Sequence, residues 1–482
     1  MGESLKQQTV KGLLWSGLEK IAFEAIQFIV GIVLARILTP HDYGTVGLIM
    51  VFITISQLFI DGGLTTALIQ KKNRTDDDFN TVFIFNFAMS AVLYMILFII
   101  APLVAKMYNI EELTSLLRLL GLVLIITPFS SIQITQLTIK VDFRTISLVS
   151  VPSAIISGAV GIVMAYNGFG PYSIVAQQII MVLSRSIIVN IISKYHIKLI
   201  FSKSSFKDLF SFSYKLVLSS SLDRIYNTVF TMIIGKVFSP TALGLYSRGT
   251  QFVSLTSGIL GSVFDRVTLP VMSSVQDDKE LFKKVFVKYI KGSSFIIFAA
   301  LIILMCVAKP LILFLLTDKW VEAVPILQLM CVAWMTNHIC FINRNVLYIM
   351  KRSDLALKLE LVKKGTAFLI FLGSLHFGII GVCVGQAIYG ILSTFLNSAY
   401  TKKFIDISIL QQTQDYGIIL IISIISAIVP YFIMGIFESN ILQMVSFVTT
   451  YAIIYILLNA VLKTEPYTML KSEIVSHRKH GQ

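Results

Sequence analysis

The sequence predicts an all-α polytopic membrane protein with about 14 transmembrane helices. Of its 482 residues, 56% are hydrophobic and 14% are charged, whereas about a quarter of the residues in a soluble globular chain are charged. The apolar residues form windows of roughly 20 residues, the length with which a helix crosses about 30 Å of hydrocarbon. These windows are continuously apolar and do not alternate in short segments, which excludes a β-barrel.

The apolar windows follow one another along almost the whole chain. The N-terminal residues MGESLKQQTVKG carry no small-residue cleavage site, so we expect no removable signal peptide. We therefore place the first span directly after them. The predicted spans are 13–36, 44–69, 80–104, 114–138, 145–167, 170–193, 210–236, 243–268, 289–314, 321–349, 355–376, 378–400, 414–437 and 441–462.

Basic residues gather in alternate connections between the spans. With the N-terminus inside, few basic residues fall in outer connections (Arg36, Lys106, Lys236, Lys309 and Lys319). Many fall in inner ones: Lys71, Lys72, Arg74, Lys140, Arg144, Lys194, Lys198, Lys203, Lys207, Lys279, Lys283, Lys284, Lys288, Lys291, Lys351, Arg352, Lys358, Lys402 and Lys403. The positive-inside rule then places both termini in the cytoplasm. This distribution explains the net charge of +14 without a nucleic-acid partner.

Residues 198–210 form an inner connection that mixes lysines with Phe and Leu at helical spacing. Such a segment is typical of a helix lying along the inner membrane surface before span seven. An ordinary solvated linker fits the same residues. The acidic run Asp76-Asp77-Asp78 in another inner connection is typical of a solvated helix N-terminus rather than of a metal site.

The chain contains an internal repeat. The stretch LARILTPHDYGTVG, which begins at Leu34, resembles IGKVFSPTALGLYS, which begins at Ile234. The offset of 200 residues spans six predicted helices, and an even number preserves orientation, so the sequence predicts two parallel six-helix repeats plus two C-terminal helices. The predicted parts are an N-terminal lobe (1–200), a C-terminal lobe (201–403), two additional spans (404–463) and a cytoplasmic tail (464–482).

Polar residues form one face of the first span. Ser16, Lys20, Glu24, Gln27 and Gly31 are spaced by three or four residues, which places them on one side of a helix. The equivalent positions of span seven hold a matching set: Ser220, Arg224, Asn227 and Thr231. If a two-fold axis relates the repeats, both faces line a central cavity. The alternatives are a buried Glu24–Arg224 pair or a local Lys20–Glu24 pair that holds helices together.

Other ionisable residues also lie within apolar windows, where a charge costs roughly 2.5–3.5 kcal/mol. Arg185, Lys215 and Lys363 are further candidates for contact with a substrate. Lys364, next to Lys363, lies one helical turn from Glu360, so a local Glu360–Lys364 ion pair fits this part of the span equally well. Glu24, Asp61 and His338 are candidates for proton coupling, although His338 also fits a satisfied interior histidine.

A cationic cavity between two repeats favours an anionic or highly polar substrate. Arginine and lysine bind phosphate oxygens well, and a sugar hydroxyl costs roughly 4–8 kcal/mol to place in hydrocarbon. No spacing predicts a metal site and no P-loop predicts ATP use. The connections also lack the length that an enzyme such as a polysaccharide polymerase needs to display catalytic carboxylates. We therefore expect neither an enzyme nor a cofactor.

The stretches LARILTPHDYGTVG and GLTTALIQ resemble the N-terminal signature of bacterial polysaccharide flippases of the O-antigen and exopolysaccharide type. These flippases belong to the multidrug/oligosaccharidyl-lipid/polysaccharide transporter superfamily. The resemblance implies an inner-membrane protein that moves undecaprenyl-diphosphate-linked oligosaccharide outward by alternating access. This transport would serve lipopolysaccharide or exopolysaccharide synthesis. The resemblance also implies a cationic cavity at Lys20, Lys215 and Arg224, with Arg185 and Lys363.

The same resemblance implies lipid-linked oligosaccharide, membrane lipids, a polysaccharide polymerase and assembly proteins as partners. Two exporters of the superfamily are alternatives, one for drugs and one for peptidoglycan precursors. A drug exporter would favour an acidic or aromatic cavity, which the basic excess opposes. The peptidoglycan exporter is closer in chemistry, but the quoted stretches resemble the polysaccharide branch better.

Overall fold

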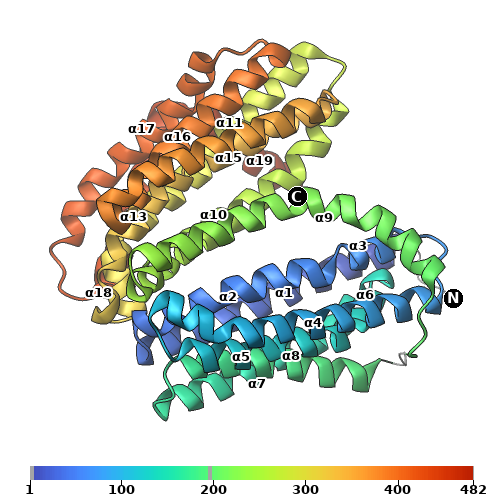
Figure 1. Cartoon of the computed structure of the whole chain (residues 1–482). Helices are drawn as coiled ribbons and strands as arrows, with labels where there is room; N and C mark the ends of the chain where they lie inside the picture. Colours follow the sequence, from blue (N-terminus) through green and yellow to red (C-terminus); the bar gives the residue numbers. More distant parts are fainter. Residues whose placement is uncertain (1–4, 194–197, 481–482) are drawn as a thin grey trace. The chain divides into compact units, whose positions relative to one another are not determined.

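The computed structural model describes residues 5–193 and 198–480 (Figure 1). Within these ranges, the side chains that stand outside the description are those of residues 5–14, 212, 214–225, 227, 262–263, 265–266 and 473–480. All elements of the described part are helical, and they divide into two compact units, Met1–Gly244 and Leu245–Gln482. The predicted all-α class is confirmed for this part of the chain.

Unit 1 contains nine helices and the first turn of a tenth. They are α1 (Leu5–Ile37), α2 (Pro40–Asp61), α3 (Leu64–Gln70), α4 (Asp76–Tyr108), α5 (Leu113–Ile126), α6 (Pro128–Ile139), α7 (Phe143–Tyr166), α8 (Pro171–Ile192), α9 (Lys203–Val237) and the start of α10 (Pro240–Ser274). Within the unit, α7 packs between α1 and α8, α5 packs on α4 and α8, and α9 packs on α2, α3 and α4. The N-terminal part of α9 thus belongs to the core of this unit.

Unit 2 contains the rest of α10 and the remaining helices. They are α11 (Lys279–Cys306), α12 (Ala308–Leu315), η1 (Asp318–Trp320), α13 (Ala323–Trp334), α14 (Asn337–Ile349), α15 (Ser353–Ser374), η2 (Leu375–Phe377), α16 (Gly378–Ile405), α17 (Ile409–Met434), α18 (Asn440–Val461) and α19 (Glu465–His480). The central helix is α16, which packs on α13, α14 and α15, while α17 packs on α11 and α18.

Every predicted span lies on a helix or on a helix pair with a short break. Among the described residues, nine helices are long and apolar enough to cross a membrane, or ten if the pair α5–α6 is one span. That pair bends by 41° where Pro128 begins α6, because proline at the first helical position donates no backbone hydrogen bond. The chain is therefore a polytopic helical membrane protein.

Two predicted inner connections are helical instead. Residues 203–210 are the first turns of α9, continuous with span seven, so neither a separate surface helix nor a solvated linker describes them. Leu209 joins a buried apolar cluster with Leu68 and Phe83. The backbone before α9 is held by α4, because Asn80 Oδ1 accepts from the Lys198 amide at 2.9 Å. The basic residues from Lys279 to Lys291 likewise form the start of α11.

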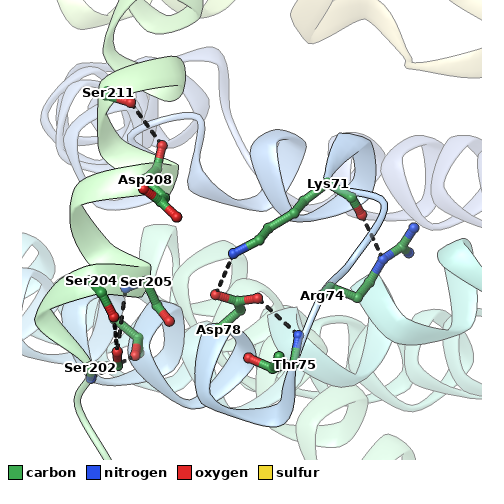
Figure 2. Close-up of polar contacts among 10 residues, drawn as sticks. Lys71, Arg74, Thr75, Asp78, Ser202, Ser204, Ser205, Asp208 and Ser211 are labelled. Carbon is green, nitrogen blue, oxygen red and sulfur yellow. Dashed lines mark hydrogen bonds and ion pairs between the residues drawn. The ribbon is translucent and has the colours of Figure 1, made fainter.

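The acidic run Asp76–Asp78 begins α4, as predicted, but its third member is buried. Asp78 closes a capping box with Thr75, and its Oδ1 accepts a hydrogen bond from Lys71 Nζ at 2.9 Å (Figure 2). Because the carboxylate satisfies both the helix end and the lysine, its burial is compensated. The expectation that this run is solvated holds for Asp76 and Asp77 and is wrong for Asp78.

The two copies of the repeat meet in unit 1 through a reciprocal contact. Pro40 begins α2 and Pro240 begins α10, and a glycine follows each proline by four residues. A Cβ atom on Gly44 would lie 1.6 Å from the Pro240 carbonyl oxygen, and one on Gly244 would lie 1.9 Å from the Pro40 carbonyl oxygen. Only glycine fits at either position. A self-complementary contact of this kind is what a local two-fold relation produces.

We expect Gly44→Ala to destabilise the protein by at least about 3 kcal/mol, because the new methyl group meets a carbonyl that no side-chain rotation can move. Thermal unfolding in detergent measures the effect. Gly17→Ala is the matched control, since a Cβ atom there meets nothing within 4 Å and alanine favours a helix over glycine. Equal melting temperatures for the two variants would show that the reciprocal contact is absent.

Candidate functional site

The polar face of α1 is partly exposed. Lys20 and Glu24 are both exposed, and no ion pair joins these two described side chains. The local Lys20–Glu24 pair that we considered from the sequence is therefore absent. Both side chains are available on this face of unit 1, which is what contact with a polar substrate requires.

Gln27, on the same helix, contacts a neighbouring helix. Gln177 on α8 is buried and donates a hydrogen bond from its Nε2 to Gln27 Oε1 at 3.3 Å. The Nε2 atom of Gln27 is buried without a hydrogen-bond partner. Gln27 thus joins α1 to α8, and its Nε2 atom remains an unused hydrogen-bond donor. Sequence reasoning missed Gln177, although two adjacent glutamines in an apolar span were a visible signal.

Arg185 lies on α8, and the carboxylate of Glu19 on α1 attracts its positive charge. Its Nε atom is buried and has no hydrogen-bond partner. An unpaired buried donor is costly, so this guanidinium is suited to bind an acceptor that the described chain does not provide. Sequence reasoning did not select Glu19.

Unit 2 contains a second basic cluster, which joins α14 to α15. Glu360 Oε1 accepts from Lys363 Nζ at 2.8 Å and lies 3.9 Å from Arg344 Nη1. The guanidinium of Arg344 also covers the Phe341 ring, at 5.0 Å from the centroid. Glu360 therefore forms its local ion pair with Lys363, which is buried, where the sequence predicted a pair with Lys364. Two cations share one carboxylate, so this cluster carries excess positive charge.

Arg344 is the member of this cluster that was not among the sequence-predicted site residues. It lies near the end of the predicted span 321–349, a place from which long basic side chains reach the membrane surface. The structure buries its Nε atom without a hydrogen-bond partner. The signal that could have revealed it is the nearby group Glu360, Lys363 and Lys364 on the following span.

The coupling candidates lie in dissimilar surroundings. His338 is buried at the start of α14, where its Nε2 lies 3.0 Å from Ser294 Oγ and its ring meets the edge of Phe298. Asp61 is exposed at the last position of α2, before the left-handed Gly62. A proton-coupling role stays a prediction for Asp61, His338 and Glu24 alike.

Three predicted residues of span seven lie on α9 with their side chains outside the described residues. They are Lys215, Arg224 and Asn227. The Glu24–Arg224 pair, one of the alternatives for the two polar faces, falls outside the description with them.

Arg185 on α8 and the cluster of Arg344, Glu360 and Lys363 share one property, a guanidinium with an unused hydrogen-bond donor. Arg185 and Arg344 each keep a buried, unpaired Nε atom inside a mainly apolar helix. Such donors fit the oxygens of phosphate or carboxylate groups. Within residues 15–480, wherever side chains are described, no group of three or more His, Cys, Asp and Glu is arranged to hold a metal ion.

Comparison with known proteins identifies the family. A family model described as "Polysaccharide biosynthesis protein" matches residues 33–325, so the chain belongs to this family. It is 25% identical over 355 residues to the teichuronic acid biosynthesis protein TuaB of Bacillus subtilis, covering 73% of this chain and 74% of that protein. It is 24% identical over 402 residues to the lipopolysaccharide biosynthesis protein WzxC of Escherichia coli, covering 82% and 81%.

Solved structures share the fold. A structure of the lipid II flippase MurJ matches with a TM-score of 0.72 and 15% identity, over 93% of this chain and 100% of that one. A multidrug resistance MATE transporter of the MOP superfamily matches with a TM-score of 0.61 and 15% identity, over 80% and 98%. The family model confirms the predicted resemblance to a polysaccharide family, and the solved structures show that the chain shares the fold of these two transporters.

We expect Glu360→Gln to lower stability by about 1–3 kcal/mol, because it leaves Lys363 and Arg344 without their shared counter-charge. The partial exposure of the carboxylate keeps the loss below that of a fully buried pair. Thermal unfolding in detergent measures it. Asp354→Asn on the same helix is the control, since its pair with Arg352 at 2.8 Å is exposed. A loss of equal size in the control would refute the buried cluster.

Proposed function

We propose that this member of the polysaccharide biosynthesis protein family is a flippase for undecaprenyl-diphosphate-linked oligosaccharides. It moves them from the cytoplasmic to the outer leaflet of the bacterial inner membrane, for lipopolysaccharide or exopolysaccharide synthesis. The single observation that carries the proposal is that each unit contains an arginine, Arg185 in unit 1 and Arg344 in unit 2, whose buried Nε donor has no partner inside an apolar helix. A diphosphate supplies the oxygen acceptors that these donors need.

The described helices support the number of spans in the proposal. The stretch Ser353–Ile405 is 53 residues long and holds two helices, and α1, α9 and α10 carry charged residues within apolar sequence. If these helices and the pair α5–α6 are counted as spans, the number reaches the proposed 14, with both termini cytoplasmic. The repeat then forms two parallel six-helix lobes, residues 1–200 and 201–403. Alternating access would expose their polar faces first to one side and then to the other.

The substrate-binding residues of the proposal are Lys20, Glu24, Gln27, Arg185, Lys215, Arg224, Asn227 and Lys363, to which we add Arg344 from its geometry. Outward movement of an anion is favoured by about 2.3 kcal/mol per charge per 100 mV when the inside is negative. Proton coupling through Glu24, Asp61 or His338 belongs to the same proposal. A polysaccharide polymerase and assembly proteins are its proposed partners in the membrane.

A peptidoglycan-precursor exporter is the second candidate function. The observation that favours it is the shared fold with a lipid II flippase, although 15% identity is evidence for the fold alone. Both substrates carry a diphosphate, so the arginines serve either one. The sugars differ, and competition between the two lipid-linked substrates distinguishes the candidates.

We expect Arg344→Gln to reduce the flux of lipid-linked oligosaccharide in proteoliposomes by roughly tenfold or more. Loss of one charge-assisted hydrogen bond costs about 1.5–3 kcal/mol, and about 1.4 kcal/mol corresponds to a factor of ten. Arg185→Gln tests the other arginine in the same assay, with the same amount of protein per vesicle.

The matched control for these variants is Arg118→Gln. Arg118 also lies on an apolar helix, but its guanidinium covers the Phe98 ring at 4.1 Å and its Nε donates to the Phe98 carbonyl. We expect its flux to stay within about twofold of the unmodified protein. Unchanged flux in both Arg185→Gln and Arg344→Gln would remove these residues from the transport pathway.

A further inference from the structure

Unit 1 contains a cavity of about 570 Å³ that the proposed transport site does not use. It lies where α4 begins, α6 ends, α7 begins and α8 ends, and it is lined among others by Arg74, Gln133, Gln136, Lys140 and Asp142. Its volume falls within the range of small-molecule sites. Four helix ends therefore border the space that a bound molecule would occupy.

The wall of this cavity holds a buried acceptor. Gln133 is fully buried, and its Nε2 donates to Asn190 Oδ1 at 2.7 Å, which fixes the orientation of its amide. Its Oε1 atom is buried and accepts no hydrogen bond. A buried acceptor without a partner is costly, so this oxygen is suited to a ligand that donates a hydrogen bond, such as a hydroxyl group.

The same cavity holds a buried donor. Arg74 Nε donates to the Lys71 carbonyl at 2.9 Å, and its Nη1 atom is buried without a partner. Asp78 does not take this donor, because Figure 2 shows the guanidinium turned away from a carboxylate that pairs with Lys71. Lys140, which is exposed, adds a second positive charge to the lining.

The acidic residues of the lining leave these donors available. Asp142 caps α7: its Oδ1 accepts from the Thr145 amide at 3.1 Å, and its Oδ2 accepts from the Thr145 hydroxyl at 2.7 Å. Asp76 lies in the first turn of α4, where the helix dipole favours a carboxylate. The unused groups are therefore a guanidinium donor and an amide acceptor, in one cavity.

We propose that this cavity binds the phosphate ester of a polyol. The phosphate accepts from Arg74 and Lys140, and a hydroxyl group of the polyol donates to Gln133 Oε1. The ligand is either the glycerol phosphate headgroup of an anionic membrane lipid or a soluble polyol phosphate, because both present the same groups. Binding joins the segment before α4, through Arg74, to α6 and its end, through Gln133 and Lys140, and so stabilises unit 1.

The test measures the thermal unfolding of the full chain in a neutral detergent while two probes are titrated. The probes are glycerol 1-phosphate and dioctanoyl phosphatidylglycerol, with methyl phosphate and dioctanoyl phosphatidylcholine as their controls. We expect at least one probe to raise the melting temperature in a saturable way, and its control to raise it much less. A response to the lipid alone identifies a headgroup site, whereas a response to glycerol 1-phosphate identifies a site open to solution.

Variants assign the response to the cavity. We expect Arg74→Gln to weaken the apparent affinity at least tenfold and Lys140→Gln to weaken it severalfold, whereas Lys72→Gln, an exposed neighbour outside the lining, has no effect. Gln133→Met should abolish the preference for glycerol phosphate over methyl phosphate. Each ligand-induced shift in melting temperature is measured relative to the ligand-free melting temperature of the same variant. Because Lys140 lies on the surface, we expect its replacement to leave the fold intact. No response to either probe, or equal responses in Arg74→Gln and Lys72→Gln, would overturn the proposal.

Discussion

The close contact of two helix starts, 200 residues apart in sequence, is the constraint on which unit 1 depends. Gly44 and Gly244 have no side chains, so each backbone approaches the proline carbonyl of the other copy. This contact fixes the start of α10 on the start of α2, and α9, which leads into it, packs along α2, α3 and α4. Two stretches that share few identical residues therefore form one self-complementary contact in the structure.

Charge inside apolar helices is the second organising feature. Some carboxylates pair with a cation of a neighbouring element, as Glu360 on α15 does with Arg344 on α14 and Asp78 on α4 does with Lys71 at the end of α3. A guanidinium can still keep an unused donor, as the buried Nε atoms of Arg185 and Arg344 show. Helix-joining contacts lower the cost of charge in the membrane. In the proposed function, the remaining donors bind an anion.

The sequence predicted most of the helices because membrane thickness determines their length and hydropathy reveals it. It also predicted the helix start at Asp76. The two-lobe repeat inferred from the stretches around Pro40 and Pro240 stays a prediction. The sequence could not predict that residues 203–210 continue into α9, because helix continuity depends on packing against α3 and α4. Nor could it separate the roles of polar residues on one helix: Gln27 meets Gln177 while Lys20 stays exposed. Arg344 was missed because position within a span does not reveal what a long side chain contacts.

The central claim is that unpaired basic groups within the helices bind the diphosphate of a lipid-linked glycan. Its most direct test is flux in proteoliposomes of one oligosaccharide attached to the same polyprenyl chain in two ways, through a diphosphate and through an uncharged linkage. The account predicts that the diphosphate form crosses at least tenfold faster and that inorganic diphosphate competes with it. Equal rates for the two forms, with no competition, would contradict the account.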